Sequence, residues 1–115
     1  MPRVQYYVYV IELDKAFART KKAQRANPNQ DLAKPCVYVG STSKTPEERF
    51  EQHVKAARSR KGYRIHSSVV LNHGICLMPE EFEKYNPIKT KKEALKKEIE
   101  LTLELRKKGY TVWSN

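Results

Sequence analysis

The stretch VYVGST at residues 37–42 decides the fold that we expect for this chain. Its first three residues are β-branched or aromatic, as is typical of a buried strand, and Gly40 ends the apolar run. Thr45, Pro46 and Glu48 then follow in the order of a helix N-cap, first turn and capping box. We therefore predict a strand over residues 35–40 that leads into a helix.

The predicted helix after residue 45 has an apolar stripe with a cationic flank. At about 100° per residue from Phe50, Val54 and Ala57 lie within about 40° of the stripe. Three basic residues fall between about −60° and −100° on the same helix: Arg49, His53 and Arg60.

A second strand is predicted upstream. Residues 5–13 (QYYVYVIEL) are rich in Tyr, Val and Ile, and alternation places Tyr7, Tyr9 and Ile11 on one face. The simplest connection to residues 35–40 is an antiparallel pair. The basic segment at residues 14–34, which contains the turn-forming Asn-Pro-Asn at residues 27–29, is predicted as a short helix followed by a loop.

Downstream, the pattern predicts three further elements. Residues 66–73 (HSSVVLNH) are typical of a short helix closed by Gly74, and residues 82–88 are a weaker strand. Residues 90–108 form the longest helix, with Thr90 as N-cap and Gly109 as its stop. The strand and helix content places the chain in the α+β class, with a small sheet flanked by helices.

One carboxylate is placed against the pattern of this last helix. At about 100° per residue from Ala94, the apolar stripe runs from about −20° to 140° and includes Leu101, Leu95 and Ile99, and Glu98 falls inside it at about 40°. An ionised carboxylate without a partner is costly to bury, so Glu98 either meets a cation or a metal or has a raised pKa. Glu98 is therefore a candidate site residue on physical grounds.

The composition limits the class of protein. A chain of 115 residues forms one domain, here residues 1–115, and no apolar run is long enough to span a bilayer, so we expect a soluble, intracellular, cytoplasmic protein. Cys36 and Cys76 lack the spacing of a zinc site or a disulfide framework and are predicted as small buried residues. A net charge of +10 favours a polyanionic partner, most often nucleic acid.

The order of these motifs resembles the GIY-YIG nuclease superfamily, the catalytic domain of intron-homing endonucleases, of the excision-repair incision subunit and of some restriction enzymes. Residues 7–9 (YVY) match its first motif, with Tyr7 in place of glycine, and residues 38–40 (YVG) match its second. Arg49 on the next helix, His53 one turn later and Glu98 complete the match, which covers nearly the whole chain.

The resemblance implies a three-stranded antiparallel sheet flanked by helices, in the order β-β-α-α-β-α. It also implies hydrolysis of DNA phosphodiester bonds with one divalent metal, Mg²⁺ or Mn²⁺. On this reading Glu98 binds the metal, which suits a hard cation that keeps several waters. Arg49 stabilises the phosphate and the leaving oxygen, as a permanently charged guanidinium can.

The remaining roles stay more open. Tyr9 or Tyr38 would position or deprotonate the attacking water, although ionising a free tyrosine at neutral pH costs about 4 kcal/mol, which nearby cations must offset. His53 would be a second phosphate contact or a proton carrier. Asn115 would match a polar residue that the family has after its last helix. The residues that we expect to contact DNA near the site are Gly40, Ser41 and Arg60.

The segment at residues 14–34 separates the two tyrosine motifs more widely than is usual in the family. We interpret its cations as phosphate contacts, Lys21, Lys22 and Arg25 among them, with a solvated surface insertion as the alternative.

Other functions remain open on the sequence alone. The tyrosines are also compatible with a plain strand core, and the charge with a non-catalytic DNA- or RNA-binding module or a ribosome-associated protein. If the chain is a nuclease, it acts on DNA structure or damage, takes its specificity from a partner protein, or cuts with little selectivity.

Overall fold

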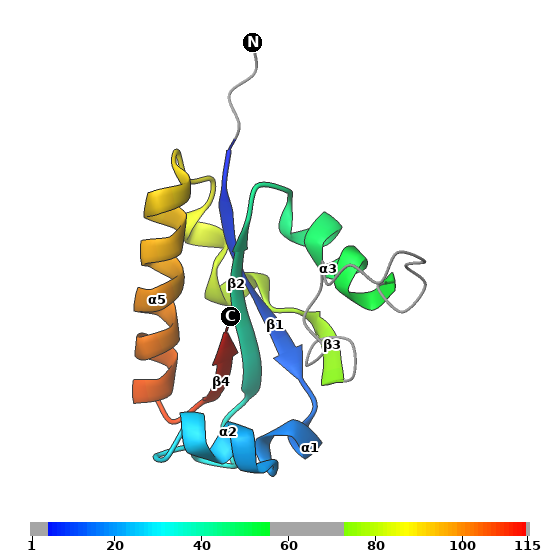
Figure 1. The fold of residues 1–115 in the computed structure, drawn as a ribbon, viewed down its shortest axis with the longest axis vertical. Coiled ribbons are helices and arrows are strands. Elements are labelled where there is room, and N and C mark those ends of the chain that lie inside the picture. Colours follow the sequence, from blue (N-terminus) through cyan, green and yellow to red (C-terminus); the bar gives the residue numbers. More distant parts are fainter. Residues whose placement is uncertain (1–4, 56–72, 115) are drawn as a thin grey trace.

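The structure is a computed structural model that describes residues 5–55 and 73–114, without the side chains of residues 52–55. A four-stranded sheet in the order β3-β1-β2-β4 forms its centre. The helices α3 (Pro46–Lys55) and α5 (Lys91–Lys107) lie on either side of it (Figure 1). The predicted α+β class, with a small sheet flanked by helices, is confirmed.

The central pair is the one predicted from sequence. The strands β1 (Tyr7–Leu13) and β2 (Cys36–Thr42) are antiparallel, with Tyr9 opposite Gly40 and Ile11 opposite Tyr38. Because side chains alternate along a strand and opposed residues share a face, the two tyrosines project from the same face of the sheet. Valines from both strands are fully buried on the other face, so both faces are covered.

The predicted third strand at residues 82–88 is wrong. The third strand is β3 (Gly74–Leu77), which pairs antiparallel with β1, and the 3₁₀ helices η2 (Pro79–Glu81) and η3 (Glu83–Tyr85) follow it. The edge of β1 next to Val8 is occupied instead by a side chain. Asn86 Nδ2 donates to the Val8 carbonyl at 2.8 Å, and the Val8 N–H donates to Asn86 Oδ1 at 2.9 Å. An amide side chain therefore satisfies the strand edge, and the apolar Phe82 is buried in a turn.

A fourth strand, β4 (Thr111–Ser114), was not predicted. It pairs parallel with β2, with Val37 opposite Val112. The sheet is therefore mixed and four-stranded, and the expectation of three antiparallel strands is wrong. Four residues give a weak sequence signal, although Val112 and Trp113 are typical strand residues. Of the predicted helix at residues 66–73, residues 66–72 lie outside the described part of the chain.

The segment between β1 and β2 joins the core. It contains α1 (Lys15–Ala18) and α2 (Lys21–Ala26), whose N-caps are Asp14 and Thr20. Phe17 is fully buried, and Ala18 and Ala23 are at most 1% exposed. The prediction of one short helix and a loop is therefore incomplete, because a second short helix also packs against the sheet.

Helix α5 keeps its predicted limits but buries a narrower stripe. The Thr90 side chain accepts from the Glu93 N–H at 3.1 Å, and Gly109, at a φ of +93°, follows the end of the helix. Its buried residues are Ala94, Glu98, Leu101, Thr102 and Leu105, whereas Leu95 and Ile99 are exposed, contrary to prediction. Over the described ranges, no helix is long and apolar enough to cross a membrane.

The two cysteines differ in their surroundings. Cys36 is buried as predicted, but Cys76, on the edge strand β3, is exposed, so its predicted burial is wrong. Both are free thiols.

Candidate active site

The site begins where β1 and β2 place Tyr9 opposite Gly40. A Cβ atom added at Gly40 would lie 2.5 Å from the Cζ atom of Tyr9, closer than real side chains approach. The Tyr9 ring therefore occupies the space that any other residue at position 40 would need. The glycine of the YVG motif is explained by this contact, and not by a left-handed turn.

Tyr9 and Tyr38 form a buried pair. Their ring centroids are 6.1 Å apart, and each side chain is at most 1% exposed. Burial raises the pKa of Tyr9, while the charge and hydrogen bond of Arg49 and the neighbouring Tyr38 hydroxyl act to lower it. Burial also raises the pKa of Tyr38, and Tyr9 and Glu98 raise it further, with only Arg49 opposing them.

The two tyrosines affect one another unequally. Their interaction lowers the pKa of Tyr9 and raises that of Tyr38. Of the two, Tyr9 is therefore the one whose ionised form its neighbours stabilise.

Arg49 is held in place by the start of α3. The Thr45 side chain accepts from the Glu48 N–H at 3.2 Å and donates to its carboxylate at 3.0 Å, and the Arg49 N–H donates to the Thr45 carbonyl at 3.0 Å. The predicted helix start is confirmed. Arg49 is half-buried and its guanidinium reaches Tyr9 across the gap between α3 and the sheet.

Glu98 enters the site from α5. Its side chain is 8% exposed, which confirms the burial inferred from its helical position. Burial raises the pKa of the Glu98 carboxyl, and hydrogen bonds from the Ser41 side chain and backbone oppose the shift. Ser41, which directly follows the YVG motif, thus orients the carboxylate, and the charge of Glu98 acts on both tyrosines.

Glu98 is the residue that could hold a metal ion in this site. Across residues 5–55 and 73–114 there is no group of three or more His, Cys, Asp or Glu side chains that could hold a metal. Glu98 would therefore contribute one carboxylate, and Mg²⁺ commonly binds through one or two carboxylates while it keeps several waters. A cation beside Glu98 would also remove the cost of burying its charge.

A polar pocket adjoins the Ser41 contact. It has a volume of about 260 Å³, and the sequence reasoning missed four of the residues that line it together with Ser41 and Ala94: Tyr6, Thr42, Ser43 and Lys91. The signal for them was the run of hydroxyl residues after Gly40 and the lysine at the first position of α5. Hydroxyls and a lysine at this point are suited to phosphate oxygens.

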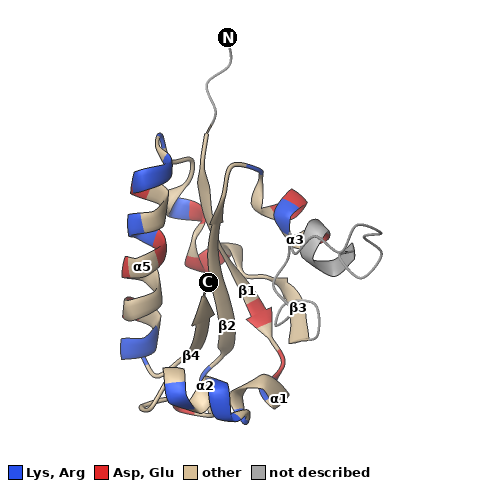
Figure 2. Ribbon diagram, viewed as in Figure 1, with Lys and Arg blue, Asp and Glu red and all other residues tan. Residues whose placement is uncertain are grey.

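Of the other predicted site residues, three cannot be placed and three lie away from this cluster on α2. His53 lies on α3, but its side chain is outside the described part of the structure, as are Arg60 and Asn115 entirely. Lys21 and Arg25 lie exposed on α2, at the far end of the sheet (Figure 2). The Nζ atom of Lys22 lies 5.4 Å from the centre of the Trp113 ring at that end.

The chain matches the family model of the GIY-YIG catalytic domain over residues 5–111, nearly its whole length. It therefore belongs to this family, whose members are endonucleases that act on DNA. No curated protein and no solved structure matches the chain.

Proposed function

We propose that the protein is a divalent-metal-dependent endonuclease that hydrolyses DNA phosphodiester bonds. One observation carries the proposal: Arg49 hydrogen-bonds to Tyr9, the Tyr38 ring lies beside it with the centroids 6.1 Å apart, and the charge of Glu98 acts on both tyrosines. A base candidate and a permanent cation from two elements thus lie in contact, and a buried carboxylate from a third lies close enough for its charge to act on both tyrosines; these are the groups that hydrolysis of a phosphodiester requires.

Tyr9 is the residue that would position the attacking water and accept its proton. A tyrosine with its ordinary pKa near 10 costs about 4 kcal/mol to ionise at neutral pH, and burial adds to this cost. Arg49 and Tyr38 act in the opposite direction, because both stabilise the Tyr9 oxygen when it is charged. Tyr38, whose own pKa is raised further, stays protonated.

Arg49 would stabilise the negative charge that develops on the phosphate. A guanidinium stays charged at every working pH and can donate two parallel hydrogen bonds to phosphate oxygens. In this structure it already bonds to Tyr9, so the same cation can favour both the ionised base and the charged phosphate.

Glu98 would hold the metal, with Ser41 fixing the direction of its carboxylate. When bound, Mg²⁺ or Mn²⁺ supplies positive charge to a phosphate oxygen and to the leaving oxygen. Thr42, Ser43 and Lys91, which line the adjoining pocket, would hold a neighbouring part of the DNA backbone.

The test is cleavage by the purified protein with Mg²⁺ or Mn²⁺, on a panel of single-stranded, double-stranded, branched and damaged DNA. We expect nicking or cleavage of at least one substrate, and the panel shows whether the enzyme is directed by DNA structure or damage. Glu98→Ala should abolish cleavage but retain folding and DNA binding. Glu100→Ala is the matched control, because Glu100 is exposed on the same helix, and it should cleave normally.

Two outcomes would contradict the proposal. Protein that binds DNA but cuts no member of the panel with either metal would be a non-catalytic binding module that keeps the nuclease fold. Cleavage that survives Glu98→Ala would remove the metal role from this residue.

A further inference from the structure

An apolar ridge follows the outward side of α5. It consists of Leu95, Ile99 and Leu103, whose side chains are 43%, 60% and 59% exposed. Residues four apart are neighbours on a helix surface, so the three form a continuous ridge about 12 Å long. Single exposed leucines are common, but a row of three large apolar side chains needs an explanation.

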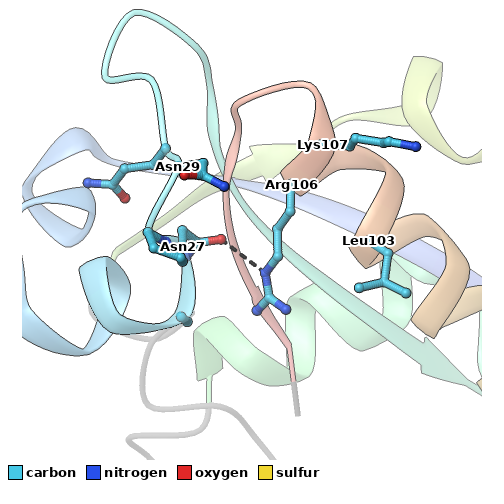
Figure 3. Close-up of a pocket in the computed structure, with 8 residues that line it drawn as sticks. Asn27, Asn29, Leu103, Arg106 and Lys107 are labelled. Atoms are coloured by element: carbon cyan, nitrogen blue, oxygen red, sulfur yellow. Dashed lines mark hydrogen bonds between the residues drawn. The ribbon is translucent and has the colours of Figure 1, made fainter.

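The ridge ends at a pocket. This pocket has a volume of about 420 Å³ and lies between the last turns of α5 and the loop after α2 (Figure 3). Leu103, Arg106 and Lys107 line it from the helix, and Pro28 and Asn29 line it from the loop. The Arg106 Nε atom donates to Asn27 Oδ1 at 3.0 Å, which fixes one wall. A pocket at the end of an apolar ridge can take one large side chain of a partner.

Lysines line one flank of the ridge. At about 100° per residue, with Ala94 as zero, the ridge lies between about 100° and 180°, and Lys92, Lys96 and Lys107 lie between about 160° and 220°. Among the residues described, none of these lysines has an ion-pair partner. The acidic residues Glu100 and Glu104 pair instead with Lys97 at 3.3 Å and Lys108 at 4.0 Å. The charge next to the ridge is therefore positive.

We propose that this surface binds an acidic amphipathic helix of a partner protein. An amphipathic helix can lay apolar residues at i, i+4 and i+7 along the ridge, with one of them in the pocket, and place carboxylates against the lysines. A second copy of this chain fits poorly, because two α5 helices would bring lysines against lysines in a protein of net charge +10. DNA fits poorly too, because its phosphates gain nothing from the three apolar side chains.

The surface is separate from the candidate active site. Glu98 lies at about 40° on the helix, so the middle of the ridge is turned about 100° away from it. A partner bound here would not cover the side of α5 from which Glu98 enters the candidate active site. The proposal therefore goes beyond nuclease activity and does not depend on it.

The experiment uses the full chain and a synthetic helical peptide of about 18 residues, labelled with fluorescein. The peptide carries leucines at i, i+4, i+7 and i+11 and glutamates on its other faces. Fluorescence anisotropy should give a dissociation constant on the order of 10 μM. The double variant Ile99→Ser, Leu103→Ser should weaken binding about tenfold or more, since each change removes apolar area at the centre of the contact.

Two controls separate this surface from general attraction to a basic protein. Leu32→Ser removes an equally exposed leucine (53%) from the loop before β2 and should leave binding unchanged. The same peptide with lysines in place of its glutamates should not bind. Equal binding of the acidic peptide to the double variant and the unchanged protein would overturn the proposal.

Other occupants give different results, and each would overturn the proposal. Dimerisation in sedimentation experiments that is lost in the double variant would assign the ridge to a second copy. Loss of DNA binding in that variant would assign it to nucleic acid. Binding to anionic lipid vesicles that is lost in the same variant would assign it to a membrane surface.

Discussion

The two ends of the sheet bury polar groups in opposite ways. At one end, which we call the asparagine end, Asn27 is 3% exposed and each of its hydrogen-bonding positions is used. Its Oδ1 accepts from the Val112 N–H at 2.9 Å and from Arg106 Nε at 3.0 Å. Its Nδ2 donates to the carbonyls of Ala23 at 2.8 Å and Val112 at 3.0 Å.

At the other end, which we call the tyrosine end, the buried polar groups are ionisable. Tyr9, Tyr38 and Glu98 all have pKa values raised by burial. Their hydrogen bonds offset this burial only in part. A neutral amide with four partners favours the folded state, whereas three desolvated ionisable groups favour it less than apolar residues would. Groups of the second kind gather at functional sites more often than elsewhere.

This difference predicts the effect of substitutions at each end of the sheet. Changes at the asparagine end should lower stability and leave the chemistry of the surviving molecules alone. Changes at the tyrosine end should lower activity and leave stability almost unchanged.

The largest effect is expected from removing one hydroxyl at the tyrosine end. Tyr9→Phe should reduce the single-turnover cleavage rate by about 10²- to 10⁴-fold, because it removes the proposed proton acceptor. Tyr38→Phe removes only the hydroxyl beside that acceptor and should cost about tenfold. Rapid-quench measurements at saturating DNA and metal compare the two variants directly.

The pair of variants also tests which tyrosine accepts the proton. A larger loss in Tyr38→Phe than in Tyr9→Phe would assign that role to Tyr38. Equal thermal stability of the two variants shows that the loss of activity is chemical, since both retain their buried rings.

The next effect is expected at the asparagine end. Asn27→Ala should lower the free energy of unfolding by about 2–3 kcal/mol, because it leaves the Val112 N–H and one donor of Arg106 without their partner and removes one of the two donors to the Val112 carbonyl. Urea denaturation measures the change. The specific cleavage rate of the folded fraction should not change.

Asn29→Ala is the control, since Asn29 is an exposed asparagine in the loop that follows. It should leave the unfolding midpoint in place. A loss of cleavage rate in Asn27→Ala at full folding would show that the two ends are coupled.

Sequence patterns could predict the tyrosine end more fully than the asparagine end. The β1–β2 pair, the start of α3 and the burial of Glu98 follow from local periodicity and capping, which a single sequence displays. The side-chain hydrogen bonds at each edge of the sheet do not follow from such local patterns. Asn86 and Asn27 each bind both backbone groups of one distant strand residue, Val8 and Val112, over more than seventy positions of the chain. Local sequence patterns do not report such contacts. For this reason a strand was predicted at residues 82–88 and β4 was not predicted.

The ridge on α5 shows the same limit. By helical periodicity Leu95 and Ile99 extend the apolar stripe of the helix, and they were therefore predicted to be part of the core. The flat sheet beneath the helix covers only a narrower arc of its circumference. Which apolar residues are left outside depends on the shape of the neighbouring element, which periodicity does not report.

A smaller effect is expected from the cations of α2. They lie at the asparagine end, but we expect them to contact DNA phosphates. Changing Lys21, Lys22 and Arg25 to Gln should weaken DNA binding about tenfold and reduce the slope of log affinity against log salt by up to about 3. Cleavage at saturating DNA should stay the same, because Gly40 lies four residues of strand, about 13 Å, from Cys36 at this end of β2. Filter binding at several salt concentrations gives the slope.

A matched variant separates a local contact from net charge. Changing Lys92, Lys96 and Lys107 to Gln removes the same charge from α5 and should affect DNA binding less. If both triple variants reduce the slope equally, the segment at residues 14–34 is a solvated insertion, as the alternative interpretation held.

The smallest effect is expected from a substitution that tests the stability of the tyrosine end. It is the most direct test of the difference between the tyrosine end and the asparagine end. In EDTA at pH 7, Glu98→Gln should leave the free energy of unfolding equal or slightly raised, although it should stop cleavage. The folded carboxyl has a pKa above its ordinary value of 4.5, so the folded state binds the proton more tightly than the unfolded state does. Stability from this group is therefore greatest below pH 4.5 and is lost as the pH rises through the raised pKa.

The Gln side chain cannot ionise, so the free energy of unfolding of the variant should not show this decline with rising pH. Urea denaturation repeated between about pH 4 and pH 7 measures it, because this range starts near the ordinary carboxyl pKa and extends above it. A variant that is clearly less stable than the unchanged protein at pH 7 would contradict the reading. It would mean that the hydrogen bonds from Ser41 outweigh the cost of burial, and that Glu98 stabilises the fold as Asn27 does. The tyrosine end would then differ from the asparagine end in its chemistry alone, and not in what its buried groups cost the folded state.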